Sequence, residues 1–293
     1  MATTYAQAAT CLICNTENTA EAMLCGSCSA PMSIVHDSIA QQRNPQVITI
    51  VGESNVGKTV YLGFLLDMLS QRAGEFKAVP KGAYSVDLQQ TVVSYMAHRM
   101  FPPKTPMEPN EWYWAYYQIC KTAQQQHQWF DLVMPDMAGE SLAAEIATPK
   151  TFKVINSLMN QSEGLIMLID AAQAANGSTQ PDFFALKMMS YIDAMSGGQR
   201  EQRVKTPTAV VLCKGDYCPE VFDDPRRFVE ANLNRVWNMC ESRFDNVEFF
   251  ASSVVGSLGY ATSGHADDYV VPVPLHTALR GVLEPFEWIT DQL

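Results

Sequence analysis

A phosphate-binding loop is the clearest chemical signal in this chain. Residues 52–59 read Gly-Glu-Ser-Asn-Val-Gly-Lys-Thr and match the pattern G-x-x-x-x-G-K-[ST]. In this pattern the backbone N–H groups of the loop turn inward around a phosphate chain. Lys58 would reach the β- and γ-phosphates, and the Thr59 hydroxyl would bind Mg²⁺. The predicted phosphate-binding residues are Gly52, Glu53, Ser54, Asn55, Val56, Gly57, Lys58, Thr59 and Val60.

The residues on either side of the loop predict the elements that position it. The apolar run 47–51 before the loop predicts a buried β-strand, and the apolar residues from Tyr61 to Leu69 predict a helix that ends near Gly74. A helix that begins at the loop adds its positive N-terminal dipole to the phosphate site.

Four of the eight cysteines form a candidate metal site. They stand as Cys11-Leu-Ile-Cys14 and Cys25-Gly-Ser-Cys28, two Cys-x-x-Cys pairs with ten residues between them. Two such pairs can complete a tetrahedral shell of four thiolates around Zn²⁺. A redox dithiol or two disulfides are the alternatives. We expect structural zinc, because residues 8–32 contain too little apolar sequence to fold without a metal.

The composition limits the classes of partner. The 293 residues are 47% hydrophobic and carry a net charge of −11, which argues against broad electrostatic binding to nucleic acid or to anionic membranes. Residues 1–40 contain no lysine or arginine, so nucleic-acid binding by the ribbon is not expected. The longest apolar run, 165–169, is far shorter than the ~18 residues of a membrane span. With no signal peptide at the N-terminus, we expect a cytoplasmic protein.

Strands alternate with helices along the rest of the chain, which predicts parallel β-α-β crossovers. The expected fold class is α/β: a P-loop NTPase with three α/β/α layers, a mostly parallel sheet, one antiparallel strand pair and a small N-terminal zinc ribbon. Residues 1–32 are predicted as the ribbon, 33–45 as a linker and 46–293 as the main domain, with a helical insertion at about 82–100. The later strands are expected at 164–170, 208–213 and 247–252, and the later helices at 181–195, 225–243 and 275–291. The aromatic segments 112–117 and 129–134 are expected to form the antiparallel pair.

A second nucleotide motif follows the predicted strand that ends at Met134. It reads Asp136-Met-Ala-Gly139-Glu140. An aspartate at a strand end that faces the phosphate loop is placed to act as a second-shell ligand of Mg²⁺. Gly139 could donate its backbone N–H to a γ-phosphate.

Two further strand ends read Cys213-Lys214-Gly-Asp216 and Phe-Ala251-Ser252-Ser. Together with the two motifs above, they resemble the motif series of Ras-like GTPases of the TRAFAC class over about residues 46–291. This resemblance implies GTP and GDP as ligands. Asp216 would accept two hydrogen bonds from guanine, Lys214 would lie along the base, and Ala251 with Ser252 would close over the guanine oxygen.

The resemblance also implies catalytic roles for Lys58, Thr105, Gly139 and Glu140. Thr105 is our choice for the threonine that would bind Mg²⁺ together with Thr59, since Thr91 lies in a predicted helix. Glu140 stands where many relatives carry a glutamine that orients water, so we expect slow hydrolysis. Cys213 replaces the usual asparagine or threonine, and a thiol braces the phosphate loop more weakly.

A closer similarity is to bacterial double-GTPases of predicted conflict or defence systems. It implies a slow GTP-dependent switch that works with a protein effector or a second GTPase. The alternatives are an ATPase, a nucleotide-loaded scaffold whose ribbon docks a protein, and a nucleic-acid-binding regulator. Lys214 and Asp216 argue against the ATPase.

Overall fold

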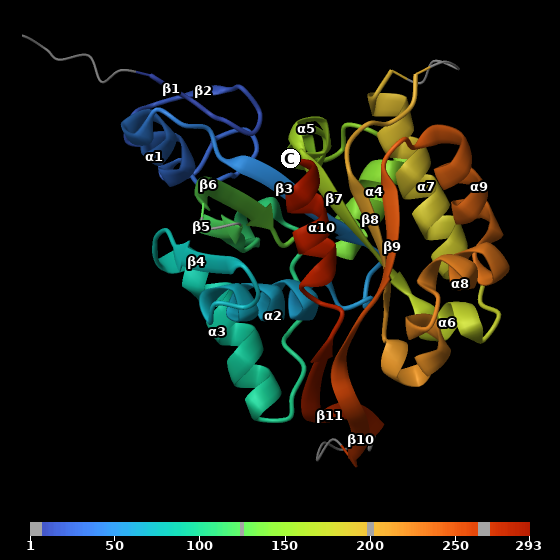
Figure 1. Ribbon diagram of the computed structural model, residues 1–293. Coiled ribbons are helices and arrows are strands. Elements are labelled where there is room, and N and C mark those ends of the chain that lie inside the picture. Colours follow the sequence, from blue (N-terminus) through green and yellow to red (C-terminus); the bar gives the residue numbers. More distant parts are fainter. Residues whose placement is uncertain (1–7, 124–125, 198–201, 263–269) are drawn as a thin grey trace, which may run out of the picture.

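A seven-stranded sheet forms the centre of the computed structural model, which describes residues 8–123, 126–197, 202–262 and 270–293 (Figure 1). The first seven residues of the predicted ribbon therefore lie outside the described residues. In spatial order the strands are β4 (Phe76–Pro80), β5 (Trp114–Ala123), β6 (Gln126–Pro135), β3 (Gln46–Gly52), β7 (Gly164–Asp170), β8 (Thr208–Cys213) and β9 (Val247–Ala251).

Strand direction follows the hydrophobic pattern. The central strands β3, β7 and β8 are apolar and buried along almost their whole length, as parallel strands covered on both faces must be. The strands from β6 to β9 are parallel, whereas β5 runs antiparallel to both β4 and β6. The predicted antiparallel aromatic pair is thus present as β5 and β6, while β4 was not predicted.

Helices cover both faces of the sheet, and the predicted three-layer α/β/α fold is confirmed. One face packs against α2 (Lys58–Ser70), α3 (Ala83–Ala97) and α10 (Glu284–Gln292). The opposite face packs against α1 (Ser33–Gln41), α4 (Gly139–Ala147), α5 (Lys153–Gln161), α6 (Ala171–Ala175), α7 (Gln180–Met195), α8 (Pro225–Asn232) and α9 (Asn234–Arg243). Short 3₁₀ turns lie at Pro109–Glu111, Gly215–Tyr217 and Pro219–Phe222.

The single helix expected at 225–243 is wrong, because two helices occupy these residues. The break lies at Leu233, whose backbone leaves the helical region (φ −129°, ψ 55°) and whose side chain is buried. Asp182 on α7 stabilises the new helix start, since its carboxylate accepts a hydrogen bond from the Val236 backbone N–H at 3.0 Å and binds Arg235 at 2.9 Å.

The final helix expected at 275–291 is also wrong in its first half. Residues Val270–Arg280 form strand β11, which pairs antiparallel with β10 (Ser253–Thr262) in a two-stranded sheet separate from the central one (Figure 1). Gly281 ends this strand in a left-handed conformation (φ +65°), and α10 begins only at Glu284. The alternating Val-Pro-Val-Pro sequence at 271–274, directly before the expected helix, suits an extended strand, and the strand continues from it to Arg280.

The N-terminal segment folds against the main body. Strands β1 (Ala9–Thr10) and β2 (Glu17–Asn18) pair with each other, and α1 follows within the predicted linker 33–45. Lys153 on α5 donates hydrogen bonds to hydroxyls of Thr16 and Ser27, both at 2.8 Å. Gln161, also on α5, donates to the backbone oxygen of Ile13 at 2.6 Å. None of the described helices combines the length and apolar character that crossing a bilayer requires.

Candidate functional site

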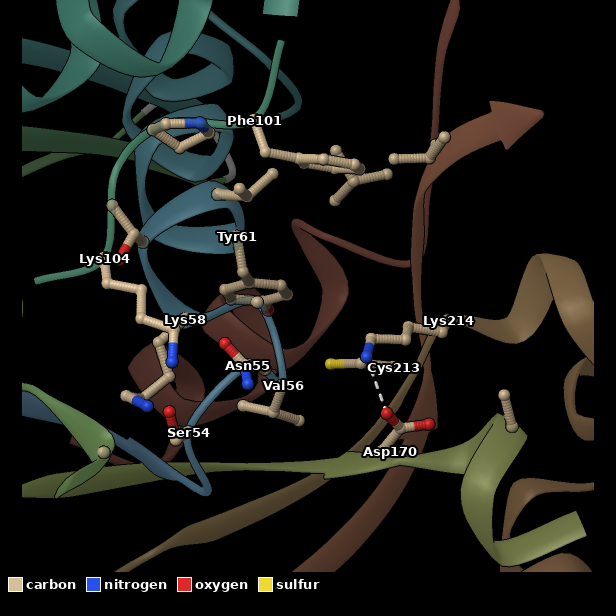
Figure 2. Close-up of a pocket in the computed structure, with 18 of the residues that line it drawn as sticks. Ser54, Asn55, Val56, Lys58, Tyr61, Phe101, Lys104, Asp170, Cys213 and Lys214 are labelled. Atoms are coloured by element: carbon tan, nitrogen blue, oxygen red, sulfur yellow. Dashed lines mark hydrogen bonds and ion pairs between the residues drawn. The ribbon is translucent and has the colours of Figure 1, made fainter. Parts of the chain in front are cut away.

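A cavity of about 790 Å³ lies at the carboxyl ends of the parallel strands (Figure 2). This is the edge at which open α/β sheets bind their ligands, and the volume falls within the usual range for small-molecule sites. The phosphate loop forms one side, and the Lys214–Tyr217 segment with the start of β10 forms the other. The Thr105 loop (residues 101–106) and residues of strands β10 and β11 complete the wall.

The phosphate loop has the backbone that its sequence predicts. Gly57 adopts φ +104° and Asn55 adopts φ 63°, conformations that turn the chain sharply into α2. The buried Lys58 ammonium donates to the backbone oxygens of Gly52 at 3.0 Å and Glu53 at 2.9 Å. Burial lowers the pKa of Lys58 to about 8, against nearby carboxylates that act in the opposite direction. The hydrogen-bond partners of the Lys58 ammonium are thus neutral carbonyl groups, and a phosphate in the cavity would supply the negative charge that they lack.

Three oxygen-bearing side chains from three separate segments meet beside Lys58. The Thr59 hydroxyl lies 3.0 Å from the Thr105 hydroxyl and 3.0 Å from an oxygen of Asp136. Thr105 donates to the same carboxylate at 2.8 Å. Burial raises the pKa of Asp136, while the hydrogen bond from Thr105 and the charge of Lys58 act to lower it. Hydroxyl and carboxylate oxygens are the hard donors that Mg²⁺ prefers, so the set fits this ion.

Gly139 and Glu140 lie directly against the phosphate loop. A Cβ at Gly139 would stand 2.4 Å from the Ser54 backbone nitrogen, so only glycine fits this approach. The Ser54 hydroxyl donates to the Glu140 carboxylate at 2.6 Å, and Lys104 lies 3.4 Å from the same oxygen. The Ser54 hydrogen bond is the main reason that the pKa of Glu140 lies below its ordinary value. Glu140 is therefore an anion held between two loops.

Asp216 lies at the opposite side of the cavity, where Ser253 orients it with a 2.9 Å hydrogen bond to one carboxylate oxygen. Among the described residues, no hydrogen bond occupies its other oxygen. The neighbouring Ser252 hydroxyl is buried and has no partner in the described part of the chain. Lys214 pairs with Asp170 at 2.6 Å, and Figure 2 shows this pair across the cavity from Lys58 and Ser54.

The structure brings most of the predicted site residues into one cavity wall but leaves some outside it. Ala251 is buried in β9 behind the wall, and Ser253 and Val254 line the cavity beside Ser252. Cys213 lines the wall, and burial raises the pKa of its thiol to about 12, so the group stays neutral. Three predicted residues do not line the cavity but hydrogen-bond to residues that do. Lys58 donates to the backbone oxygens of Gly52 and Glu53, and Thr105 donates to Asp136.

Two residues at this site were missed in the sequence. Asp170 ends the apolar strand β7, and an acidic residue at a strand end is the same signal that identified Asp136. Ser253 directly follows the predicted Ser252, but nothing in the sequence indicated which serine would contact Asp216. The β10 and β11 residues in the wall, among them Leu258 and Pro272, carried no sequence signal.

The four N-terminal cysteines form a compact sulfur cluster. Their Sγ atoms lie within 4.8 Å of one another, with 3.6 Å between Cys11 and Cys28 and 3.5 Å between Cys14 and Cys25. Zn–S bonds of about 2.3 Å in a tetrahedron place sulfur atoms roughly 3.8 Å apart, so the cluster fits zinc. The hydrogen bond with Cys28 lowers the pKa of Cys11, which favours the thiolate form that binds metal.

The fold and the phosphate loop define the chain as a Ras-like P-loop protein of the α/β class. The profile of the Double-GTPase 1 family matches residues 49–215, which is more than half of the chain. The chain belongs to the Double-GTPase 1 family. No curated protein matches the sequence.

This chain also shows low similarity to solved structures of GTPases. The GTP-bound GTPase-like domain of Ski7 from S. cerevisiae is 18% identical, with a TM-score of 0.43, and the match covers 75% of this chain and 45% of that one. The signal recognition particle receptor SRb-GTP/SRX complex from Chaetomium thermophilum is 14% identical, with a TM-score of 0.40, and covers 73% of this chain and 93% of that one. The present chain thus spans less than half of the Ski7 chain.

Proposed function

We propose that the chain binds GTP and GDP with Mg²⁺ and hydrolyses GTP slowly as a molecular switch. The observation that carries this proposal is the Asp216 carboxylate. Ser253 holds one of its oxygens, and no described residue hydrogen-bonds the other. Asp216 and Lys214 line the same cavity as Lys58 and Thr59. Family membership supports the same reading.

Asp216 has the chemistry of a guanine detector. A carboxylate accepts hydrogen bonds and donates none, so it suits the two neighbouring N–H donors on the guanine edge. Adenine presents an acceptor at the corresponding ring nitrogen and lacks the second amino group. The buried Ser252 hydroxyl, which lacks a partner in the described part of the chain, is available to the bound base.

Mg²⁺ would be held by the Thr59 and Thr105 hydroxyls, with Asp136 acting through water. The ion would neutralise charge on the β- and γ-phosphates during hydrolysis. Loss of the γ-phosphate would then release the Thr105 loop and the segment at Gly139. We propose that a protein effector or a second GTPase reads this change, and that a bacterial defence system is its setting.

The first test compares binding of GDP, GTP and ADP to the wild-type protein and to the Asp216→Asn variant by titration calorimetry with Mg²⁺. We expect the wild type to prefer guanine nucleotides. The variant loses two hydrogen bonds to a charged acceptor, each worth about 1.5–3 kcal/mol. GDP affinity should therefore fall at least about 100-fold. Equal binding of ADP and GDP by the wild type would overturn the proposal.

Asp170→Asn tests whether Asp170 positions Lys214 for the base. Asparagine keeps an acceptor for the Gln173 backbone N–H, which Asp170 binds at 3.0 Å, but removes the ion pair with Lys214. We expect GDP affinity to fall about 5- to 30-fold, which corresponds to about 1–2 kcal/mol. This is toward the low end for a hydrogen bond to a charged group, because the Lys214 side chain is 36% exposed. Asp245→Asn, at an exposed pair with Arg203, is the matched control and should bind GDP like the wild type. Equal GDP affinity in the two variants would refute the role of Asp170.

A nucleotide-loaded scaffold that hardly hydrolyses GTP is the second candidate. The Glu140 carboxylate favours it, because Ser54 and Lys104 already hold this group in place. Single-turnover assays separate the two candidates. Measurable phosphate release from bound GTP supports the hydrolase, whereas tight GTP binding without release supports the scaffold.

A further inference from the structure

Three cationic side chains line the cavity among the described residues: Lys58, Lys104 and Lys214. Two of them are committed elsewhere. Lys58 is buried against the carbonyl groups of the phosphate loop, and Lys214 is paired with Asp170. Lys104 differs, because its side chain is 66% exposed and extends from the Thr105 loop toward the phosphate loop. In Figure 2 its side chain lies on the same side of the cavity as Lys58 and Ser54.

The backbone at Lys104 is anchored by the residue that follows it. Thr105 lies 3.0 Å from the Thr59 hydroxyl and 2.8 Å from Asp136, so the predicted Mg²⁺ ligands fix where the Lys104 side chain begins. From this point the ammonium reaches the Glu140 oxygen at 3.4 Å. The Ser54 hydroxyl donates to the same oxygen. Segments far apart in the sequence therefore meet at one atom.

Lys104 can offset the negative charge that Glu140 places near the γ-phosphate. An anion beside the γ-phosphate would repel the charge that its oxygens carry during hydrolysis. The ammonium of Lys104 stands next to this anion on a flexible four-carbon chain, so it can neutralise the carboxylate and still contact a phosphate oxygen. A cation at this place has the role that an arginine finger plays in other GTPases.

We propose that Lys104 is a catalytic cation, supplied within the chain, that contacts the γ-phosphate and offsets the charge of Glu140. This inference rests on the proposed GTPase function. In the reaction, a water oxygen bonds to the γ-phosphorus while the bond from that phosphorus to the β–γ bridging oxygen breaks. The electron pair stays on GDP, a proton passes from the water to the released phosphate, and Lys104 stabilises the negative charge throughout.

The test compares single-turnover GTP hydrolysis in the wild type and in Lys104→Ala, Lys104→Arg and Lys187→Ala. Lys187 is an exposed lysine on α7 and serves as the control. We expect Lys104→Ala to lower the hydrolysis rate about 10- to 100-fold, below the loss seen for a buried arginine finger because Lys104 is more exposed. Lys104→Arg should retain most of the rate, and Lys187→Ala all of it.

Nucleotide affinity provides a second readout that a merely structural role would not move. Because GDP lacks the γ-phosphate, Lys104→Ala should bind GDP within about twofold of the wild type. Its affinity for a non-hydrolysable GTP analogue should fall several-fold. If the wild type and the Lys104→Ala variant hydrolyse GTP at the same rate, the role of Lys104 is overturned, while the proposed hydrolase function stands. A wild type that binds GTP without hydrolysing it would overturn the proposed hydrolase and this inference together.

Discussion

Replacing Lys58 by methionine is expected to abolish tight binding of both GTP and GDP. Lys58 is buried and lines the cavity at the phosphate loop, and the only hydrogen-bond partners of its ammonium in the described structure are two carbonyl oxygens. Removing one partner of a buried charge pair costs about 2–5 kcal/mol. This loss corresponds to a roughly 30- to 4,000-fold rise in Kd. Titration with fluorescent GDP and GTP analogues measures it.

The stability of the nucleotide-free protein separates a binding role from a structural one. Burial lowers the pKa of Lys58 from 10.5 to about 8. Because the folded pKa lies below the unfolded one, the charged lysine destabilises the nucleotide-free fold at pH 7. Lys58→Met keeps the side-chain volume and removes this charge, so its melting temperature without nucleotide should equal or exceed that of the wild type. A lower melting temperature with unchanged GDP affinity would contradict the assignment of Lys58 to the phosphates.

Removal of zinc is expected to destabilise the main domain as well as the N-terminal zinc ribbon. The fully buried side chains of Ile13, Met32 and Ile34 belong to the same hydrophobic core as the sheet. Each contributes roughly 1.5–3 kcal/mol through burial. At about 2–4 °C per kcal/mol for a domain of this size, their exposure should lower the melting temperature by about 10 °C or more. Scanning calorimetry with and without a chelator measures the shift, and elemental analysis of the purified protein identifies the metal.

A Cys11→Ser variant is the matched control for the chelator. Since it lacks one of the four thiolates, it should melt near the temperature of the chelated wild type and should not respond to chelator. If the wild type contains zinc but melts at the same temperature after its removal, the proposed structural role of the metal is refuted. A fall in melting temperature in both proteins on adding chelator would show that the chelator acts elsewhere.

The features that could be predicted from the sequence are those whose parts lie close together along the chain. The phosphate loop and both cysteine pairs are short continuous patterns. Their geometry depends on local backbone and ligand chemistry, as the left-handed Asn55 and Gly57 show. The apolar runs of β3, β7 and β8 indicated buried parallel strands, because such strands need apolar residues on both faces. The family and the three-layer fold follow from these same segments.

Features that depend on contacts between distant segments could not be predicted in this way. The helix pattern at 225–243 was continuous in the sequence, but the buried carboxylate of Asp182, far earlier in the chain, stabilises a second helix start within it. The residues of β11 pair with β10 and extend as a strand, and no local pattern indicated this pairing.

The site follows the same division. Residue types and order pointed to Lys58, Thr59, Asp136 and Asp216, because each lies in or beside a recognisable motif at a strand end. The pairing of Lys214 with Asp170, the support of Asp216 by Ser253, and the meeting of Ser54, Lys104 and Glu140 depend on folding. The reason is that a hydrogen bond or an ion pair requires atoms within about 3–4 Å. Only the packing of the sheet and its loops brings side chains 36 to 86 residues apart in sequence to that distance.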